Sequence, residues 1–314
     1  MASVLSARHF HDERAAYAFV EARVWANGRV CPHCGTIGNS TALKGKSTRP
    51  GVYKCKDCRK PFTVKVGTVF EASNVKLHIW LQAMHLLCSS KKGFTANQLS
   101  RVLGVTLKTA WFMGHRIREA MRGGELAPFG AGGGDVEVDE TYWGIDPDAK
   151  PTSTGNRGGG GHHKMKVLTL VDRAQGRARS FVVDSLKATE IAPILSANIA
   201  KEARLLTDQA TMYVGHGRMF RDHQSVNHAK GEYVRFSDPV VHTNTVEGYF
   251  SVFKRGMKGT YQHCAKRHLH RYMAEFDFRY SARVALGVGD VERTDRALGG
   301  VVGKRLKYRD SLAA

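Results

Sequence analysis

Hydrophobic positions in the N-terminal part of the chain follow a helical spacing on both sides of a turn-rich stretch at residues 31–70. The residues after Leu77 repeat an apolar position every three or four residues, which predicts an amphipathic helix. Two shorter helical segments follow and are separated at Gly104. Thr106 is the expected N-cap of the second segment, because its hydroxyl can accept a bond from the first turn.

The pattern changes after a Gly-rich segment at residues 123–134. From Asp135 the chain alternates apolar and polar positions, as a strand does. Two further apolar runs surround a turn at Gly176, which predicts a hairpin, and residues 187–203 predict a helix. The sequence ARLLTD then predicts a short buried strand. A hairpin followed by a helix and a strand favours an α/β layer fold with a mixed sheet.

These patterns predict a multidomain chain whose helical half precedes an α/β half. The sequence from Thr243 is helical and basic, whereas the residues after Arg283 are basic and only weakly patterned. A further Gly-rich stretch, residues 151–163, resembles a mobile surface loop more than a phosphate-binding loop, because it lacks the Gly-Lys-Ser/Thr ending. The expected division is 1–70 for an N-terminal helix and the turn-rich stretch, 71–122 for a helical region, 123–134 for a linker, 135–283 for the α/β domain and 284–314 for a basic tail.

The charge of the chain indicates a polyanionic partner. Its 314 residues carry 48 basic and 28 acidic side chains, which gives a formal charge of +20 and a pI near 9.9. Nucleic acid is the usual partner of such a chain, and an anionic membrane surface is the alternative. The sequence shows no apolar stretch long enough to cross a membrane and no signal-peptide core. We therefore expect a cytoplasmic protein that associates with the nucleoid and not with a membrane.

Four cysteines form two CxxC pairs within the turn-rich stretch: Cys31 with Cys34, and Cys55 with Cys58. Two such knuckles place four thiolates around one tetrahedral Zn²⁺. Two disulfides or four core cysteines are the alternatives, and a reducing compartment disfavours the first. A closed set of four thiolates predicts a structural zinc site in a zinc ribbon.

The two short helices around Gly104 have the layout of a helix-turn-helix. Lys108 and Thr109 near the start of the second helix are then expected to reach the major groove. Arg116 and Arg118 are expected to contact phosphates. The alternative is a helical hairpin that packs a core, because the motif is degenerate.

Three acids stand out in the second half of the chain. Asp139 lies in an alternating strand where Glu137 shares its face, and Asp208 ends an apolar strand. Asp135 and Glu140, the latter in a consecutive Asp-Glu pair, are nearby alternatives to Asp139. Asp208 alone fits a helix N-cap as well as a metal ligand. Glu247 lies one helical turn after Asn244, beside basic residues that favour a phosphate-binding surface. A solvated strand edge, a cap and a helix surface would explain the three acids individually.

Together, the motifs CPHC…CKDC, VDETYWG, LLTD and HTNTVEGYFSVFKRGMKGTYQH…HLHRYMAEFDFRYSAR resemble the bacterial insertion-sequence transposases of the DDE class. The group most similar to this chain has an N-terminal zinc ribbon and an RNase H-like catalytic domain, and is related to the Merlin elements. The resemblance implies that Asp139, Asp208 and Glu247 bind two Mg²⁺ or Mn²⁺ ions, with Asn244 as a rival or helper. His223 and His228 also match the family without an assigned role.

The resemblance further implies a DNA transposase that binds terminal inverted repeats, cleaves the element ends and joins their 3′ ends to target DNA. Joining two ends implies a homodimer or a larger assembly. A DNA-binding regulator without catalysis and a metal-dependent nuclease without strand transfer are the alternatives. The phosphates of the bound DNA are expected to contact four basic residues: Lys254, Arg255, Lys258 and Arg267.

Overall fold

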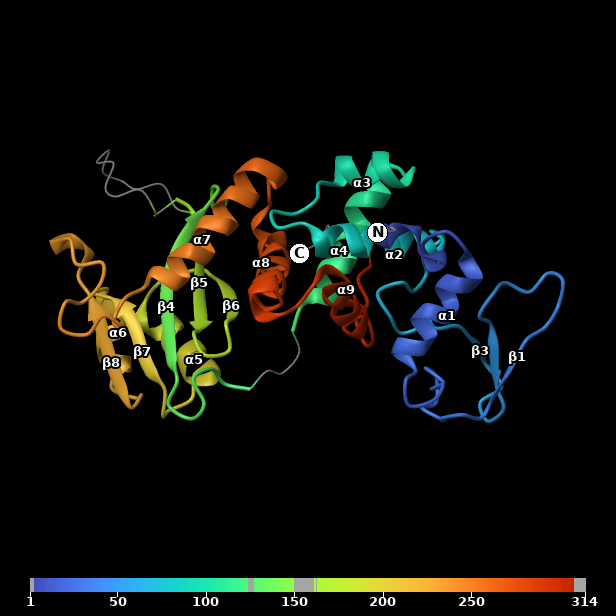
Figure 1. The fold of residues 1–314 in the computed structure, drawn as a ribbon, viewed down its shortest axis with the longest axis horizontal. Coiled ribbons are helices and arrows are strands. Elements are labelled where there is room, and N and C mark those ends of the chain that lie inside the picture. The colour runs from blue at the N-terminus through green and yellow to red at the C-terminus, as the bar shows by residue number, and fades with distance from the viewer. Residues whose placement is uncertain (1–2, 124–126, 150–160, 162, 308–314) are drawn as a thin grey trace. The chain divides into compact units, whose positions relative to one another are not determined.

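The computed structural model describes residues 3–123, 127–149, 161 and 163–307 (Figure 1). Almost all of the Gly-rich stretch predicted as a surface loop at residues 151–163 lies outside these residues. No helix in the described part of the chain is both long enough and apolar enough to span a membrane. The chain divides into two compact units, namely Met1–Arg122 with Gly287–Ala314, and Gly123–Leu286.

The first unit is a set of helices with a small sheet. The Asp12 side chain caps α1 by accepting from the Ala15 amide, and α2 buries an almost continuous apolar face. Glu13 on α1 accepts from the Leu77 amide at 2.8 Å, so one helix supplies the cap that the other lacks. The helical elements are η1 (Val4–Ser6), η2 (Arg8–Phe10), α1 (Glu13–Val24), α2 (Leu77–Ser89), α3 (Ala96–Leu103), α4 (Leu107–Met121) and α9 (Asp290–Gly299).

The predicted helix-turn-helix corresponds to α3, a left-handed turn and α4. Thr95 and Gln98 form a capping box at the start of α3, and Thr106 caps α4 by accepting from the Thr109 amide. Gly104 ends α3 with φ of 63°, a conformation that glycine adopts without steric cost. The predicted N-cap at Thr106 is therefore confirmed.

The weakly patterned residues after Arg283 were not expected to form regular structure, and this is wrong for Asp290–Gly299, which form the helix α9. This helix packs on α2 within the first unit, where Arg293 donates to the Cys88 carbonyl at 2.8 Å. Thr294 Oγ1 lies 3.1 Å from Nδ1 of His85 on α2. The buried face of α9 is partly polar, so its sequence carries little of the apolar periodicity that reveals a helix.

The zinc ribbon is a three-stranded antiparallel sheet in the order β1-β2-β3. Its small core contains Cys31, Cys55 and Phe62, with Trp25 and Tyr53 packed against them. The strands are β1 (Ser40–Ala42), β2 (Tyr53–Cys55) and β3 (Pro61–Phe62).

The second unit contains a five-stranded mixed sheet in the order β6-β5-β4-β7-β8. Within this sheet, β5 is antiparallel to both β4 and β6, whereas β7 is parallel to both β4 and β8. This topology is RNase H-like, and it confirms the predicted mixed sheet and the hairpin at Gly176. The strands are β4 (Asp135–Trp143), β5 (Met165–Asp172), β6 (Arg177–Val183), β7 (Arg204–Asp208) and β8 (Asp222–Val226).

Helices cover both faces of this sheet (Figure 1). Val136 and Val138 face the core beneath α5 and α6, and Glu137 faces α7, as strand alternation predicted. The α5 helix is shorter than the predicted 187–203, because the chain is extended at Ile199 and bridges to Phe129 there. The remaining elements are α5 (Ala188–Asn198), α6 (Thr211–Gly217), η3 (His228–Lys230), α7 (Asn244–Gly256), the π-helical turn η4 (Met257–Tyr261), α8 (Lys266–Ser281) and η5 (Val284–Leu286).

Candidate functional site

Three carboxylates meet at one edge of the mixed sheet: Asp139, Glu140 and Asp208. Asp139 and Glu140 lie on β4 and Asp208 ends β7, and these strands are parallel neighbours. One oxygen from each carboxylate lies within 4.8 Å of the others. Asp139 lies in the middle of β4, beside the carboxyl end of β7, so the parallel pairing of these strands brings together acids that are distant in the sequence.

The environment of Asp139 favours a bound cation. Burial, followed by the charge of Glu140, raises the pKa of Asp139 to about 8, and Asp208 and Glu247 add to the shift. Burial and the charge of Asp208 also raise the pKa of Glu140. Crowded carboxylate oxygens are the donors that Mg²⁺ and Mn²⁺ prefer, and a cation would remove the repulsion among them. The residues present therefore fit a divalent metal.

Asp208 is not the N-cap of α6, which is Ala210; its carboxylate lies in the turn before that helix and in the acidic cluster. One of its oxygens, Oδ1, accepts from the Ala210 amide at 2.9 Å and so fixes the turn that leads into α6. The carboxylate still belongs to the acidic cluster. A carboxylate has two oxygens, so an amide contact on one leaves the other for a metal.

Glu247 lies near this cluster without being part of it. Its side chain is 44% exposed on the first turn of α7, and its Oε1 lies 3.6 Å from His228 Nε2. Its charge nevertheless contributes to the raised pKa of Asp139. Asn244 is the exposed first residue of the same helix. The assignment of the third ligand to Glu247, with Asn244 as its rival, stays a prediction.

Glu140 is the cluster member that strand alternation failed to indicate. Adjacent residues on a strand point to opposite faces, so alternation alone does not bring Asp139 and Glu140 together. In the structure the Tyr213 hydroxyl donates to Glu140 Oε2 at 2.8 Å, which holds this carboxylate beside the other two. The consecutive Asp-Glu pair was the sequence signal for it.

A buried ion pair ties the start of α7 to β4. Glu137 has no exposed surface, and its Oε1 accepts from Arg173 Nε at 2.5 Å. Its Oε2 accepts from the Val246 amide at 2.7 Å, where a capping side chain would normally bind. Thr243, the N-cap of α7, makes no such side-chain bond. Glu137 therefore sets the position of the helix turn that carries Glu247.

Replacing Glu137 with alanine is expected to destabilise the catalytic unit by about 1–3 kcal/mol, because it leaves the buried Val246 amide without an acceptor, while Asp135 still pairs with Arg173 at 3.7 Å. Glu137→Gln keeps an acceptor for Val246 and should cost less. Urea denaturation of the full chain, followed by far-ultraviolet circular dichroism, measures both changes. Equal stability of wild type and Glu137→Ala would show that the pair does not hold α7.

The two histidines of the DHQSVNHAK segment have different surroundings. His223 is held inside the fold, with its Nε2 2.9 Å from Thr207 Oγ1, and burial lowers its pKa. Its ring lies against Gly217, because a Cβ atom added at Gly217 would come within 2.0 Å of His223 Nδ1. His228 instead faces Glu247 and lies 3.2 Å from Thr243 Oγ1. Of the two, His228 is therefore the one placed to influence the third predicted ligand.

The prediction that Arg116 and Arg118 contact DNA is wrong. Both side chains are buried, at 5% and 4% exposure. Arg116 donates to the carbonyl groups of Val69, Glu71 and Leu306, which are distant in the sequence and together hold the first unit. From the sequence alone, a basic residue on a helix is expected at the surface, because the distant carbonyl groups that accept its hydrogen bonds are not visible there.

The other predicted DNA contacts stay exposed. Lys108 is exposed near the start of α4 and Thr109 is half-buried beside it. In the second unit, the predicted phosphate contacts are exposed on α7, η4 and α8. They are Lys254, Arg255, Lys258 and Arg267.

The four predicted zinc ligands converge in the ribbon. The Sγ atoms of Cys31 and Cys58 are 3.7 Å apart, and those of Cys34 and Cys55 are 3.6 Å apart. Tetrahedral Zn²⁺ with bonds of about 2.3 Å requires sulfur separations of about 3.8 Å. The four cysteines form a structural zinc site.

Sequence comparisons agree with this fold and site. Residues 132–281 match the ISXO2-like transposase domain family, and residues 11–61 match the transposase zinc-ribbon domain family. A protein of Halobacterium salinarum, described as an uncharacterized protein in transposable element ISH50, is 28% identical over 279 residues. That alignment covers 85% of this chain and 90% of the relative.

Fold, acidic cluster and family matches together define a DNA-transposing enzyme. An ISXO2-like transposase domain preceded by a transposase zinc-ribbon domain is consistent with an insertion-sequence transposase of the DDE class that carries an N-terminal zinc ribbon. The predicted family is therefore confirmed.

Lowering the pH from about 8 towards 4 is expected to stabilise the metal-free catalytic unit. The pKa of Asp139 is about 8 in the folded chain against an ordinary value of 3.8, so the folded state binds the additional proton between these values. The free energy of unfolding contributed by this group therefore falls as the pH rises through that window. Thermal melting in a chelator at several pH values measures it, and Asp139→Asn should show a weaker dependence. Identical pH dependence of melting in wild type and Asp139→Asn would show that burial does not raise the pKa of Asp139.

Proposed function

We propose that the protein binds the terminal inverted repeats of its element, cleaves the element ends and transfers their 3′ ends into target DNA. The observation that carries this proposal is the convergence of Asp139, Glu140 and Asp208 where β7 ends beside the middle of β4, its parallel neighbour in an RNase H-like sheet. The family match supports a DNA substrate, and the acidic cluster supports phosphodiester chemistry at that site.

Asp139 and Asp208, with Glu247 from α7, are proposed to hold two Mg²⁺ or Mn²⁺ ions. Such ions supply an activated water and stabilise the leaving 3′ oxygen. The Tyr213 hydroxyl keeps the Glu140 carboxylate within the same cluster, where it is available as a further oxygen donor.

The basic residues exposed on α7, η4 and α8 are proposed to hold the phosphates of the scissile strand. In the first step, water attacks the phosphodiester and the bond to the 3′ oxygen of the element end breaks. In the second step, that 3′ hydroxyl attacks a target phosphodiester, a new bond forms and the target 3′ oxygen leaves. Neither step needs a covalent bond between protein and DNA.

Recognition of the end is assigned to the zinc ribbon and to the exposed start of α4, which carries Lys108 and Thr109. Joining two ends requires two bound ends, so we propose that the protein acts as a homodimer or a larger assembly at the nucleoid. The dimer is expected to form on DNA.

Incubation of the purified chain with duplex DNA from the repeats that flank its gene, together with Mg²⁺ or Mn²⁺, tests the proposal. Site-specific nicking at the end followed by joining to a second duplex is the expected result. Binding without cleavage would instead show a regulator, and cleavage without joining would show a nuclease. Either outcome overturns the transposase mechanism.

A further inference from the structure

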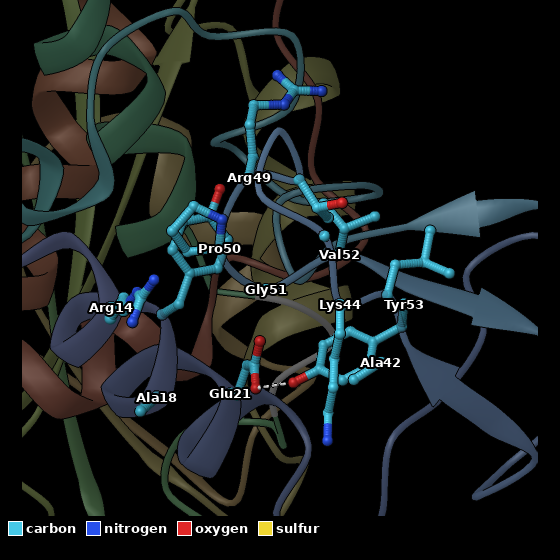
Figure 2. Close-up of a pocket in the computed structure, with 14 residues that line it drawn as sticks. Arg14, Ala18, Glu21, Ala42, Lys44, Arg49, Pro50, Gly51, Val52 and Tyr53 are labelled. Carbon is cyan, nitrogen blue, oxygen red and sulfur yellow. Dashed lines mark hydrogen bonds between the residues drawn. The ribbon is translucent and has the colours of Figure 1, made fainter.

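The first unit contains a cavity of about 460 Å³ between α1 and the loop that joins β1 to β2. Figure 2 shows Arg14 on one side of this cavity, Arg49 above it and Lys44 in front. Its volume falls within the range of about 300–1,000 Å³ that is usual for ligand sites. The cavity is distinct from the zinc site and from the acidic cluster of the second unit.

The wall of the cavity is fixed by contacts within the first unit. The Tyr53 hydroxyl donates to Glu21 Oε2 at 2.7 Å, which joins β2 to α1 (Figure 2). Gly51, with φ of 70°, lies against the Tyr17 ring so closely that a Cβ atom there would come within 2.2 Å of it. The loop is closed at its base by a bond from the Leu43 amide to the Val52 carbonyl. The cavity is therefore a built feature of the ribbon.

The charge around the cavity is unbalanced. Arg14, Lys44 and Arg49 are exposed, and none has an ion pair or side-chain hydrogen bond within the part of the chain that the structure describes. The Glu21 carboxylate is the acidic group of the wall, and Tyr53 already occupies one of its oxygens. Three cations without carboxylate partners repel one another, and an anion between them would relieve that repulsion.

We propose that this cavity binds the backbone phosphates of the duplex DNA at the element end, with Arg14, Lys44 and Arg49 as the contacts. The assignment rests on the proposed function, because that function supplies the DNA. The position of Tyr53, two residues before the zinc ligand Cys55 on β2, ties the cavity wall to the zinc site. Zinc binding thus holds the phosphate site in shape.

Fluorescence anisotropy of a labelled duplex from the terminal repeat, measured at several salt concentrations, tests the proposal. Each phosphate contact contributes about 0.9 to the slope of log affinity against log salt. Lys44→Ala and Arg49→Ala are each expected to reduce the slope by about 1, and the double variant by about 2. A double variant with the wild-type slope would overturn the assignment.

Two further variants separate the cavity from the general charge of the ribbon. Lys54→Ala removes an exposed cation from the strand residue next to Tyr53, on the opposite face, and should change the slope less than Lys44→Ala does. Ala18→Trp places a large ring at an exposed cavity position without removing charge and should weaken binding as Lys44→Ala does. Equal effects of Lys44→Ala and Lys54→Ala, or no effect of Ala18→Trp, would overturn the assignment of the cavity as a phosphate site.

The failure of this proposal is distinguishable from failure of the proposed function. If the wild-type chain binds and joins end DNA while the cavity variants retain its salt slope, only the cavity assignment falls. If the wild-type chain shows no preference for end DNA over unrelated duplex, both proposals fall.

Discussion

Asp139→Asn and Asp208→Asn are each expected to lower end cleavage and 3′-end joining by roughly 10³-fold or more. Each substitution removes a carboxylate donor from the cluster formed by the middle of β4 and the end of β7. Metal ions at such a site stabilise the transition state by several kcal/mol, and each 1.36 kcal/mol corresponds to a factor of about ten in rate. Gel analysis of nicked and joined products from a labelled element end measures both steps.

Binding measurements separate this loss from misfolding. Both variants should bind end DNA as tightly as wild type, because neither substitution removes a basic residue that is proposed to contact DNA. Calorimetric titration with Mn²⁺ should show weakened metal binding in the same variants, independently of activity. Full strand transfer by either variant would show that the acidic cluster is not the active site.

The same assays decide the third ligand. Glu247→Gln should match the loss in Asp139→Asn if Glu247 binds metal, whereas Asn244→Ala should then have a small effect. If Glu140→Gln abolishes Mn²⁺ binding and Glu247→Gln does not, the third ligand is Glu140. The structure makes this comparison necessary, because Glu140 lies within the cluster and Glu247 lies beside it.

The parts of the fold that rest on local patterns were predictable from the sequence. The alternation before Asp139 predicted β4 and its buried face, and the turn at Gly176 predicted the β5–β6 hairpin. The paired CxxC knuckles predicted the zinc site. In these cases the residues that define the feature are close together, or their spacing is imposed by one metal ion.

Features that depend on contacts between distant segments were not predictable. Arg116 is buried because carbonyl groups near residues 70 and 306 accept its hydrogen bonds, and nothing near position 116 indicates them. The α9 helix likewise docks through Arg293 and Thr294, so its apolar pattern is weak.

The candidate site shows the same division. Asp139 was indicated by its alternating strand and Asp208 by its position at the end of an apolar strand, but the pairing of β4 with β7 that brings them together is a long-range contact. Glu137 shares a face with Asp139, as predicted, yet its role as the cap of α7 depends on a residue more than 100 positions later. Sequence patterns therefore predicted the acids of the site more completely than the long-range contacts that hold them in place.

Removal of zinc is expected to unfold the ribbon and to abolish end binding while leaving the second unit folded. The ribbon core is small and includes two of the four zinc ligands, so little apolar packing remains without the metal. Structural zinc sites contribute about 10–16 kcal/mol in isolated zinc-finger peptides, far more than such a core supplies. Cys55→Ser, or treatment with a zinc chelator, should therefore eliminate specific binding of end DNA in the anisotropy assay.

Cys264→Ser is the matched control, because Cys264 belongs to the second unit and lies outside the zinc cluster. Atomic absorption should give one zinc per chain for wild type and Cys264→Ser, and less for Cys55→Ser. Mn²⁺ binding should persist in Cys55→Ser, because the acidic cluster is built within the second unit. Loss of Mn²⁺ binding together with zinc would show that the two sites depend on one another. Unchanged end binding after zinc removal would show that the ribbon, with the cavity beside it, does not recognise the element end.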